Sequence, residues 1–313
     1  MDSISPKDTR GMGALMNSRI YASDSPETLS TVYNLAIQGV PHTFAVSERE
    51  MADAFDGPVC CKAAKGLRGQ RIWFAGQGAD IHGVIHIALE DQEPPAPSRG
   101  IIRFFWYARG HRAAGQALLE QAEAHFRQQG IGRLLAWHYD HTYPFYHVEH
   151  AYLSQQLDQV HALLGMNGYA VQGSELVLDW PDFDPSLPDP VDASLKLTIN
   201  WESGRAQRPG LVLLAHKGED EVGVCVCSSL GEVSSARQAQ DWVYTRWLGV
   251  DEAWRGRGLG RYLMRRALHA LYDVGYRHAT ICTLGDNHRA FLLYTNLGYR
   301  AVDWTHAYEK ALV

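Results

Sequence analysis

A proline- and aspartate-rich segment, WPDFDPSLPDP over residues 180–190, divides the 313-residue sequence into two parts. Proline fixes φ and removes a backbone donor, and aspartate favours turns, so helices and strands rarely continue through such a segment. A chain of this length usually forms two domains. We therefore expect a first domain over residues 1–180, a linker over residues 181–191 and a second domain over residues 192–313.

Both parts show the same order of apolar patterns, which predicts an α/β fold. In the first part we expect helices over 26–40 and 48–55, strands over 71–75, 81–89 and 101–107, a helix over 113–129, a strand over 134–137 and a helix over 151–164. In the second part we expect strands over 195–201, 211–216, 222–227 and 243–250, a helix over 259–274, a strand over 279–283 and a helix over 287–297. Ser47 and Glu50 form a capping-box pattern before the second helix.

The two parts resemble a diverged internal repeat. Placing Gly115 on Gly260 also pairs the apolar positions of the long helix and the glycine that ends it, namely Leu118 with Leu263, Ala122 with Ala267, Phe126 with Leu271 and Gly130 with Gly275. Further on, Gly168-Tyr169 matches Gly298-Tyr299 with a different shift, so the first part carries extra residues before its last helix.

Composition excludes several classes of protein. Hydrophobic residues make up 46% and charged residues 20%, as in chains that bury a core. The net charge of −6 argues against a nucleic-acid partner, and no apolar run is long enough to span a membrane. The five cysteines lack the CxxC spacing of zinc sites and are typical of reduced thiols. We therefore expect a cytoplasmic protein without nucleic-acid or membrane partners.

The motif RGRGLG, residues 255–260, carries the strongest chemical signal. It follows a predicted strand and opens a predicted helix, so its glycines let the backbone approach a ligand beside unpaired N–H groups at the helix start. Arg255, Arg257 and Arg261 add positive charge. This arrangement is typical of a diphosphate site, although a glycine-rich turn with solvated arginines has the same pattern.

The second part resembles the GNAT acyltransferase superfamily over residues 241–310. Two separated motifs carry the resemblance: Arg255-x-x-Gly258-x-Gly260, and Asn287 followed by Tyr294 and Gly298-Tyr299. The tandem layout is similar to that of mycothiol synthases. The resemblance implies two tandem domains, each a mixed, mostly antiparallel twisted sheet that is flanked by helices and has a splayed central strand pair.

The resemblance also implies roles for individual residues. Acetyl-CoA would lie in the opening between the splayed strands and serve as the acyl donor, with no metal. Tyr294 would protonate the leaving thiolate as the catalytic acid. Donor-binding positions would be Leu248 and Val250 on the strand, Arg255, Gly256, Arg257, Gly258, Leu259, Gly260 and Arg261 in the turn, and Asn287.

The acceptor side is less defined. Family positions that face the acceptor fall at Tyr244 and Arg246, neither of which is an ordinary base at neutral pH. Asp241, Glu252 and Asp286 lie nearby in sequence, and a water chain is a further alternative, so the general base stays open. Only residues 202–210 separate the first two strands of the second part, too few for the helices that cover the acceptor in the family. The first part or a second subunit would have to form that wall.

The first part keeps the layout of the family and loses its chemistry. In the alignment Gly110-His-Arg-Ala-Ala-Gly115 replaces RGRGLG, while Leu157 and Leu164 stand at Asn287 and Tyr294. We expect a structural or acceptor-binding domain here. Its extra segment, WHYDHTYPFYHVEH over residues 137–150, could line a substrate pocket, form a surface loop or bind a metal, although its spacing matches no zinc motif.

Together these patterns predict a tandem acetyltransferase with one working site, in the second part. It would transfer an acetyl group to the amine of a small molecule by direct attack in a ternary complex, as a monomer or homodimer. The alternative is a non-catalytic acyl-CoA-binding sensor or interaction protein.

Overall fold

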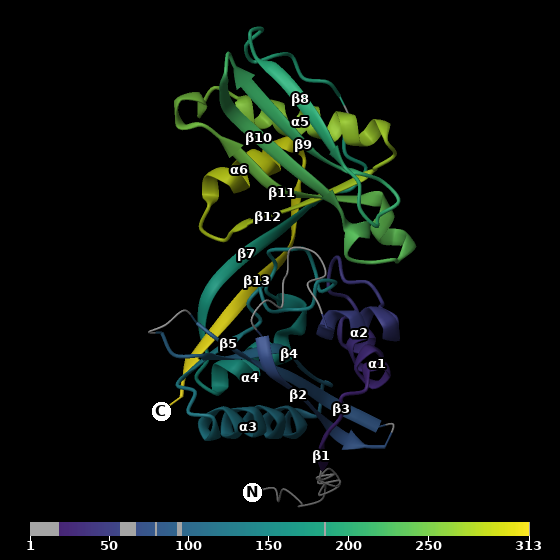
Figure 1. The fold of residues 1–313 in the computed structure, drawn as a ribbon, viewed down its shortest axis with the longest axis vertical. Coiled ribbons are helices and arrows are strands. Elements are labelled where there is room, and N and C mark those ends of the chain that lie inside the picture. The colour runs from purple at the N-terminus through teal and green to yellow at the C-terminus, as the bar shows by residue number, and fades with distance from the viewer. Residues whose placement is uncertain (1–18, 57–66, 79, 93–95, 185, 313) are drawn as a thin grey trace, which may run out of the picture.

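The computed structural model describes residues 19–56, 67–78, 80–92, 96–184 and 186–312. Two lobes, one from each half of the chain, are joined by a pair of long strands, and the C-terminus lies beside the first lobe (Figure 1). In the first half the elements are β1 Arg19–Ala22, α1 Pro26–Ala36, α2 Glu48–Asp56, β2 Leu67–Gln77, β3 Asp80–Glu90, β4 Arg99–Tyr107, α3 Arg112–Gln128, β5 Arg133–Ala136, β6 Leu153–Ser154, α4 Asp158–Met166 and β7 Ala170–Trp180.

In the second half the elements follow the same order, without the two helices after the first strand and without a counterpart of β6. They are β8 Lys196–Glu202, β9 Gly210–Lys217, β10 Asp220–Ser229, β11 Trp242–Val250, α5 Leu259–Asp273, β12 His278–Leu284, α6 His288–Leu297 and β13 Arg300–Ala311. The mixed, mostly antiparallel sheet with flanking helices confirms the predicted fold class. The domain bounds 1–180 and 192–313 stay a prediction.

One sheet runs through both halves, in the order β1-β2-β3-β4-β5-β13-β7-β12-β11-β10-β9-β8, with β6 beside β13. The two halves exchange their last strands. Strand β7 follows α4 in the first half but pairs with β12 of the second, from Ala279↔Trp180 to Leu284↔Glu175. Strand β13 follows α6 but pairs with β5 of the first half. The two exchanged strands also pair with each other, so each half completes the other's sheet.

The sequence patterns did not predict β1, β7 or β13. Polar residues interrupt the apolar alternation of the exchanged strands, which gain their burial from partners far away in the sequence. The predicted helix over 151–164 was wrong in its first part, because Leu153–Ser154 form β6 against His306 and Thr305 of β13. Long-range pairing overrides the helical periodicity there, and α4 begins only at Asp158.

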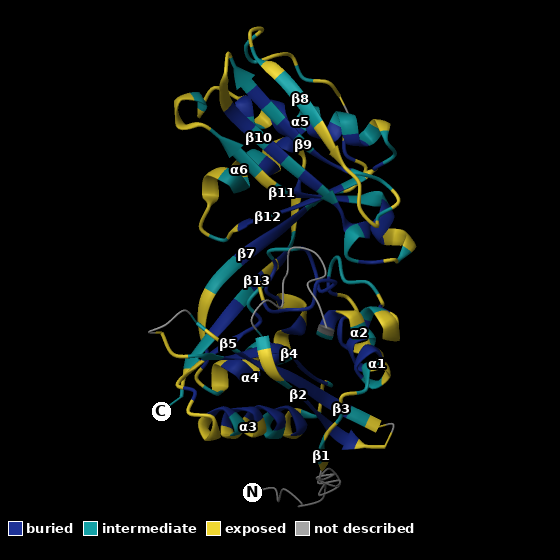
Figure 2. Cartoon of the chain, viewed as in Figure 1, coloured by how far each residue is buried: buried dark blue, intermediate teal, exposed yellow. Residues whose placement is uncertain are grey.

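Each half has its own hydrophobic core, and a smaller cluster joins them. The first core lies between its sheet and helices α1, α3 and α4, and it includes Tyr33, Phe104 and Phe126. The second core lies between its sheet and helices α5 and α6, and it includes Leu263, Leu268 and Tyr299. The joining cluster combines residues of both halves, namely Val148, Ala151, Val177, Leu230, Ala239 and Tyr244. Buried residues follow β7 and β13 from one lobe into the other (Figure 2). Apolar burial across the halves therefore favours one continuous structure.

A polar contact reinforces this junction at α2. The predicted capping box is present, since Glu50 Nα–H donates to Ser47 Oγ (3.2 Å) and Ser47 Nα–H donates to Glu50 Oε2 (2.9 Å). The other oxygen of Glu50 accepts hydrogen bonds from the backbone N–H and hydroxyl of Ser235 in the second half, at 3.2 and 2.9 Å. One side chain thus begins a helix and joins the halves.

Candidate active site

The central strands of the second half separate at one end. Parallel pairing of β11 with β12 runs from Trp242↔His278 to Thr245↔Ile281. Strand β11 continues to Val250 and β12 to Leu284, and beyond the last pair the facing backbone edges diverge. An extended ligand inserted in such an opening can hydrogen-bond to the free strand edge, as in β-strand addition.

A β-bulge at Arg246 sets which side chains face each side of this opening. Opposite β10, the register moves from Cys227↔Thr245 to Val226↔Trp247, so Arg246 is the extra residue. Thr245 and Leu248 therefore both pack on the side of the second core, whereas Tyr244 belongs to the cluster that joins the halves. The predicted donor-side and acceptor-side residues of β11 thus lie on opposite faces.

The glycine-rich turn lies at the start of α5, beside this opening. Gly256 and Gly258 have φ values of 77° and 86°, which residues other than glycine rarely adopt. Gly258 is the N-cap, and no side chain of the described residues caps this end of α5. A Cβ on Gly260 would lie 3.6 Å from Val250, 3.7 Å from Leu293 and 3.8 Å from Leu248. The structure thus brings together the predicted turn, strand and helix positions.

The arginines of the turn surround this helix start. Arg255, Arg257 and Arg261 are all exposed. Arg255 Nε donates to the carbonyl oxygen of Val250 (3.1 Å), and the Arg257 guanidinium lies 5.5 Å from the ring centre of Trp254. Exposed guanidinium groups beside uncapped helical N–H groups favour a phosphate ligand.

Two predicted site residues lie on α6. Asn287 is its N-cap, and its side-chain oxygen accepts a hydrogen bond from Ala290 N–H (3.1 Å), which is a structural role. Tyr294 is buried, with its ring 6.0 Å from that of Tyr299. Burial raises the pKa of the Tyr294 phenol, with further increases from Cys225, Cys282 and Glu175. The phenol is therefore protonated at neutral pH, as an acid must be.

The matching place in the first half is filled by protein. Only residues 108–111 link β4 to α3, whereas residues 251–258 link β11 to α5. A Cβ on Gly115 would lie 2.4 Å from the Tyr107 ring, which covers this glycine. The Tyr107 hydroxyl donates to the carbonyl oxygen of Gln159 on α4 (2.6 Å) and so bridges the opening.

The helix positions of the first half also differ in chemistry. Leu157 is the N-cap of α4 and provides no side-chain cap, while Asn287 caps α6. Leu164, at the place of Tyr294, is fully buried. At both positions the first half therefore lacks the polar side chains that α6 has.

The extra segment of the first half reaches the second half. Arg246 donates to Glu149 through Nε–Oε2 (2.6 Å) and Nη2–Oε1 (3.1 Å), and His150 Nδ1 lies 2.7 Å from the Tyr244 hydroxyl. A small pocket lies between the halves, with Tyr244 and Arg246 in its wall together with Pro144, His147, Val148, Glu149, Ser228, Ser229, Leu230, Glu232 and Val233. Of the three sequence interpretations, lining of a pocket therefore fits this segment.

The other histidines of the segment bind single carboxylates. His141 Nε2 lies 3.0 Å from Glu90, and His147 Nε2 lies 3.2 Å from Asp303. Over the described ranges, no group of three or more His, Cys, Asp or Glu side chains has a metal-binding arrangement.

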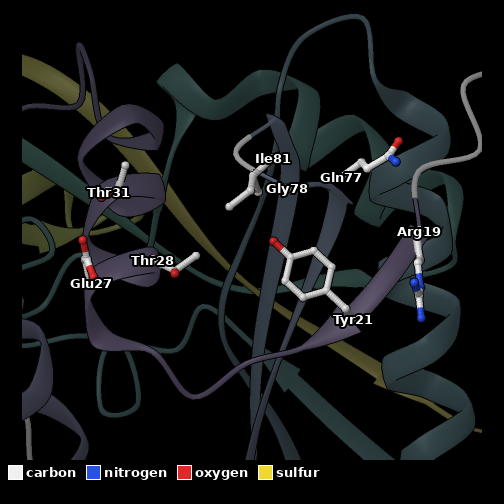
Figure 3. A pocket seen from close by; sticks show the side chains of 9 residues that line it. Arg19, Tyr21, Glu27, Thr28, Thr31, Gln77, Gly78 and Ile81 are labelled. Atoms are coloured by element: carbon white, nitrogen blue, oxygen red, sulfur yellow. The ribbon is translucent and has the colours of Figure 1, made fainter.

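A different hollow opens at the far end of the first half, where Tyr21 of β1 faces Thr28 of α1 and the β2–β3 turn (Figure 3). It contains none of the predicted site residues.

Glu175 is a buried carboxylate near the site that the sequence reasoning missed. It lies on exchanged strand β7, opposite Leu284 of β12, where β12 has already left β11. Glu175 is 7% exposed to solvent. Burial, and after it the charge of Asp286, raises the pKa of Glu175 to about 8. Because the sequence patterns did not predict β7, only the exchanged pairing places Glu175 here.

Comparison with known proteins identifies the family. The sequence model of the Acetyltransferase (GNAT) family matches residues 175–299, from β7 to the end of α6. An N-acetyltransferase of Escherichia coli K12, YhbS, described as uncharacterized, is 32% identical over 127 residues, which cover 40% of this chain and 70% of that protein. The chain belongs to the GNAT acetyltransferase family. Its predicted membership is confirmed.

Other GNAT relatives match shorter segments. N-alpha-acetyltransferase 30 of Xenopus laevis is 32% identical over 91 residues, and the mycothiol acetyltransferase of Beutenbergia cavernae is 36% identical over 94 residues. These matches cover 29% and 30% of this chain. The chain spans about a third of the length of these two curated relatives, 32% and 30% respectively.

Two solved structures share the fold of this chain along almost its whole length. A tandem GNAT protein from the clavulanic acid biosynthesis pathway superimposes with a TM-score of 0.67 at 13% identity, covering 94% of this chain and 98% of that one. A GCN5-related N-acetyltransferase from Sphaerobacter thermophilus superimposes with a TM-score of 0.59 at 13% identity, covering 95% of this chain and 96% of that one.

In the part of the chain that the structure describes, every helix is too short or too polar to cross a membrane.

Proposed function

We propose that this GNAT protein transfers an acetyl group from acetyl-CoA directly to the amine of a small molecule, at one site in its second half. The observation that carries the proposal is the separated β11–β12 edge beside the uncapped start of α5. An uncapped helix start attracts phosphate, and a free strand edge can bind an extended amide-containing chain. Acetyl-CoA carries both a diphosphate and an extended amide-containing chain.

The residues of the second half would divide the donor chemistry. Backbone N–H groups from Arg257 to Gly260 would hold the diphosphate, and the free edge at Leu248 and Val250 would bind the pantetheine chain. A backbone N–H of this edge would polarise the thioester carbonyl. Tyr294, kept protonated by burial, would protonate the leaving thiolate.

The acceptor would bind on the opposite face of the sheet, between the halves. The second half has no helices between β8 and β9, and the first half covers this face with residues 148–150. The ion pair of Glu149 with Arg246 and the contact of His150 with Tyr244 would hold this wall in place. The acceptor site would therefore be complete only in the full chain.

Two measurements test the proposal. Titration calorimetry should show one acetyl-CoA site per chain, and a panel of small amines should include acceptors that release CoA thiol. Donor binding without thiol release for any amine would instead favour a non-catalytic acyl-CoA-binding protein. No donor binding to the folded chain would refute both.

A further inference from the structure

We propose that Glu175, on exchanged strand β7, accepts the proton that the acceptor ammonium must lose before its nitrogen attacks the thioester. The inference rests on the acetyl-transfer function proposed above and deepens it. It assigns the missing base to the first half of the chain, although the donor site belongs to the second.

Strand pairing orients Glu175 toward the acceptor face. Residues 175–180 pair regularly with β12, so Glu175 and Val177 share one face of the sheet. Val177 packs in the cluster that joins the halves, beside Tyr244 and Ala151. Glu175 therefore lies under the extra segment, on the same face as the predicted acceptor residue Tyr244.

The surroundings of Glu175 suit a compact cation. Tyr139 of the extra segment and Tyr152, two residues beyond it, lie with ring centres 5.5 Å apart, and the Glu175 charge raises the pKa of both phenols. The charge of Asp286 also acts on this carboxylate, and the charge of Glu175 acts on Tyr244 and Tyr294. Aromatic faces beside a carboxylate attract an ammonium group. Glu149 and His150 lie at the edge and bind Arg246 and Tyr244.

Among the residues that the structure describes, none forms a hydrogen bond with the Glu175 carboxylate, and burial and the charge of Asp286 account for its raised pKa. A buried ionised carboxylate without partners is unfavourable, so it holds a proton up to unusually high pH. A bound ammonium would stabilise the ionised form and could then transfer a proton to it.

The other carboxylates that the sequence offered as general-base candidates are less suitable for that role than Glu175. Asp241 forms an ion pair with Arg208 at 2.8 Å and directly precedes β11, at the end of this strand away from the opening. Glu252 is exposed in the turn after β11. Asp286 is exposed and acts on Glu175 through its charge. Of these four, Glu175 alone is buried on the acceptor face.

The proposed step balances as follows. The acceptor ammonium transfers one proton to a Glu175 oxygen, and its free electron pair forms the C–N bond with the thioester carbon. The C–S bond breaks, its electron pair stays on sulfur, and the Tyr294 hydroxyl protonates the thiolate. The new amide nitrogen returns its second proton to the Tyr294 oxygen. Glu175 finally releases its proton to water.

The test compares the full-length wild type with Glu175→Gln, Asp286→Asn and a control, Asp220→Asn. The control removes the same charge from an exposed position at the start of β10. Wild-type kcat/KM for the acceptor should rise with pH through a limb near pH 8. E175Q should lower kcat/KM at least 100-fold while acetyl-CoA affinity changes less than twofold. D286N should move the limb to lower pH, and D220N should leave it in place.

A second readout does not depend on turnover. Difference infrared spectra of the free protein should show a protonated carboxyl band that titrates near pH 8 in the wild type and is missing from E175Q. Wild-type kcat/KM and pH limb in a folded E175Q, or no shift with D286N, would overturn the inference alone. If the wild type released no thiol with any amine, the proposed function would fail, and this inference with it.

Discussion

Glu149 of the first half and Arg246 of the second form a two-pronged ion pair, with N–O distances of 2.6 and 3.1 Å. Arg246 is the bulged residue of β11, so the pair joins the extra segment to the irregularity that shapes the site. A planar guanidinium bound by both carboxylate oxygens has one preferred orientation. In the proposed function, the pair would therefore hold the acceptor wall against the second half.

Weakening this ion pair should reduce acceptor binding more than it reduces the stability of the folded protein. We expect Glu149→Gln to raise the acceptor KM about threefold to tenfold and leave the acetyl-CoA KM unchanged. The cost in stability should stay below about 1 kcal/mol, because the pair is partly exposed. Steady-state kinetics and thermal melts measure both. As a control, Asp184→Asn breaks the surface pair with Arg265 and should leave both KM values as they are. Equal rises in both KM values would contradict the proposed wall.

The two halves offer a matched pair of glycines for testing the donor site. Gly258 and Gly110 have φ values of 86° and 87°, and a Cβ on either meets nothing within 4 Å. Gly258→Asp should lower acetyl-CoA affinity at least tenfold, or about 1.4 kcal/mol, because it places a negative charge beside the proposed diphosphate site. Gly110→Asp bears the same backbone strain and should leave affinity unchanged. Calorimetry that finds equal losses in both variants would argue for strain instead.

Removing the Tyr294 hydroxyl should slow chemistry without weakening donor binding. Tyr294→Phe keeps the ring in its buried place. We expect kcat to fall roughly 100-fold, within the range of general acid catalysis, with little change in acetyl-CoA affinity. Tyr299 lies beside Tyr294, so Tyr299→Phe is the control variant, and it should retain most of kcat. Wild-type kcat in Y294F, measured where chemistry limits the rate, would remove Tyr294 from this role.

Strand exchange predicts which fragments fold. A fragment of residues 192–313 leaves β12 and β13 without the strand that lies between them. A fragment that begins at Gly168 includes β7 and restores both pairings. Circular dichroism should show a cooperative melt for the longer fragment and little stable structure for the shorter one. Both should turn over the acceptor poorly, because the extra segment is missing. Full activity of either fragment would refute the shared acceptor site.

Glu175 should make stability depend on pH. The folded state holds its proton up to about pH 8, whereas the unfolded chain releases it near pH 4.5. Between these values the unfolded state binds fewer protons, so the contribution of Glu175 to stability falls as pH rises. Glu175→Gln has no carboxyl group at this position, so this pH-dependent loss of stability should be absent from the variant. We expect the Tm of E175Q relative to the wild type to increase by roughly 2 °C or more from pH 5 to pH 8.5. A difference in Tm that is constant with pH would contradict the raised pKa.

Much of the donor side could be predicted from local sequence. The turn at residues 255–260, the N-cap at Asn287 and the helix that carries Tyr294 depend on glycine conformation, capping and helical spacing, which nearby residues decide. The alignment of Leu157 with Asn287 also agrees with the helix starts, since both residues are N-caps. These features lie within single elements or adjoining turns.

The acceptor side depended on contacts between distant residues. Nothing in the local pattern of residues 170–180 or 300–311 indicates that β7 and β13 change partners. A strand's neighbours are decided by which edges remain open after the other elements have packed, and this is a property of the whole sheet. The sequence by itself determined the family, the repeat and the donor motif. Tertiary structure alone decided that Glu175 and Glu149 of the first half reach the proposed site of the second, because burial and pairing joined segments that are far apart in the chain.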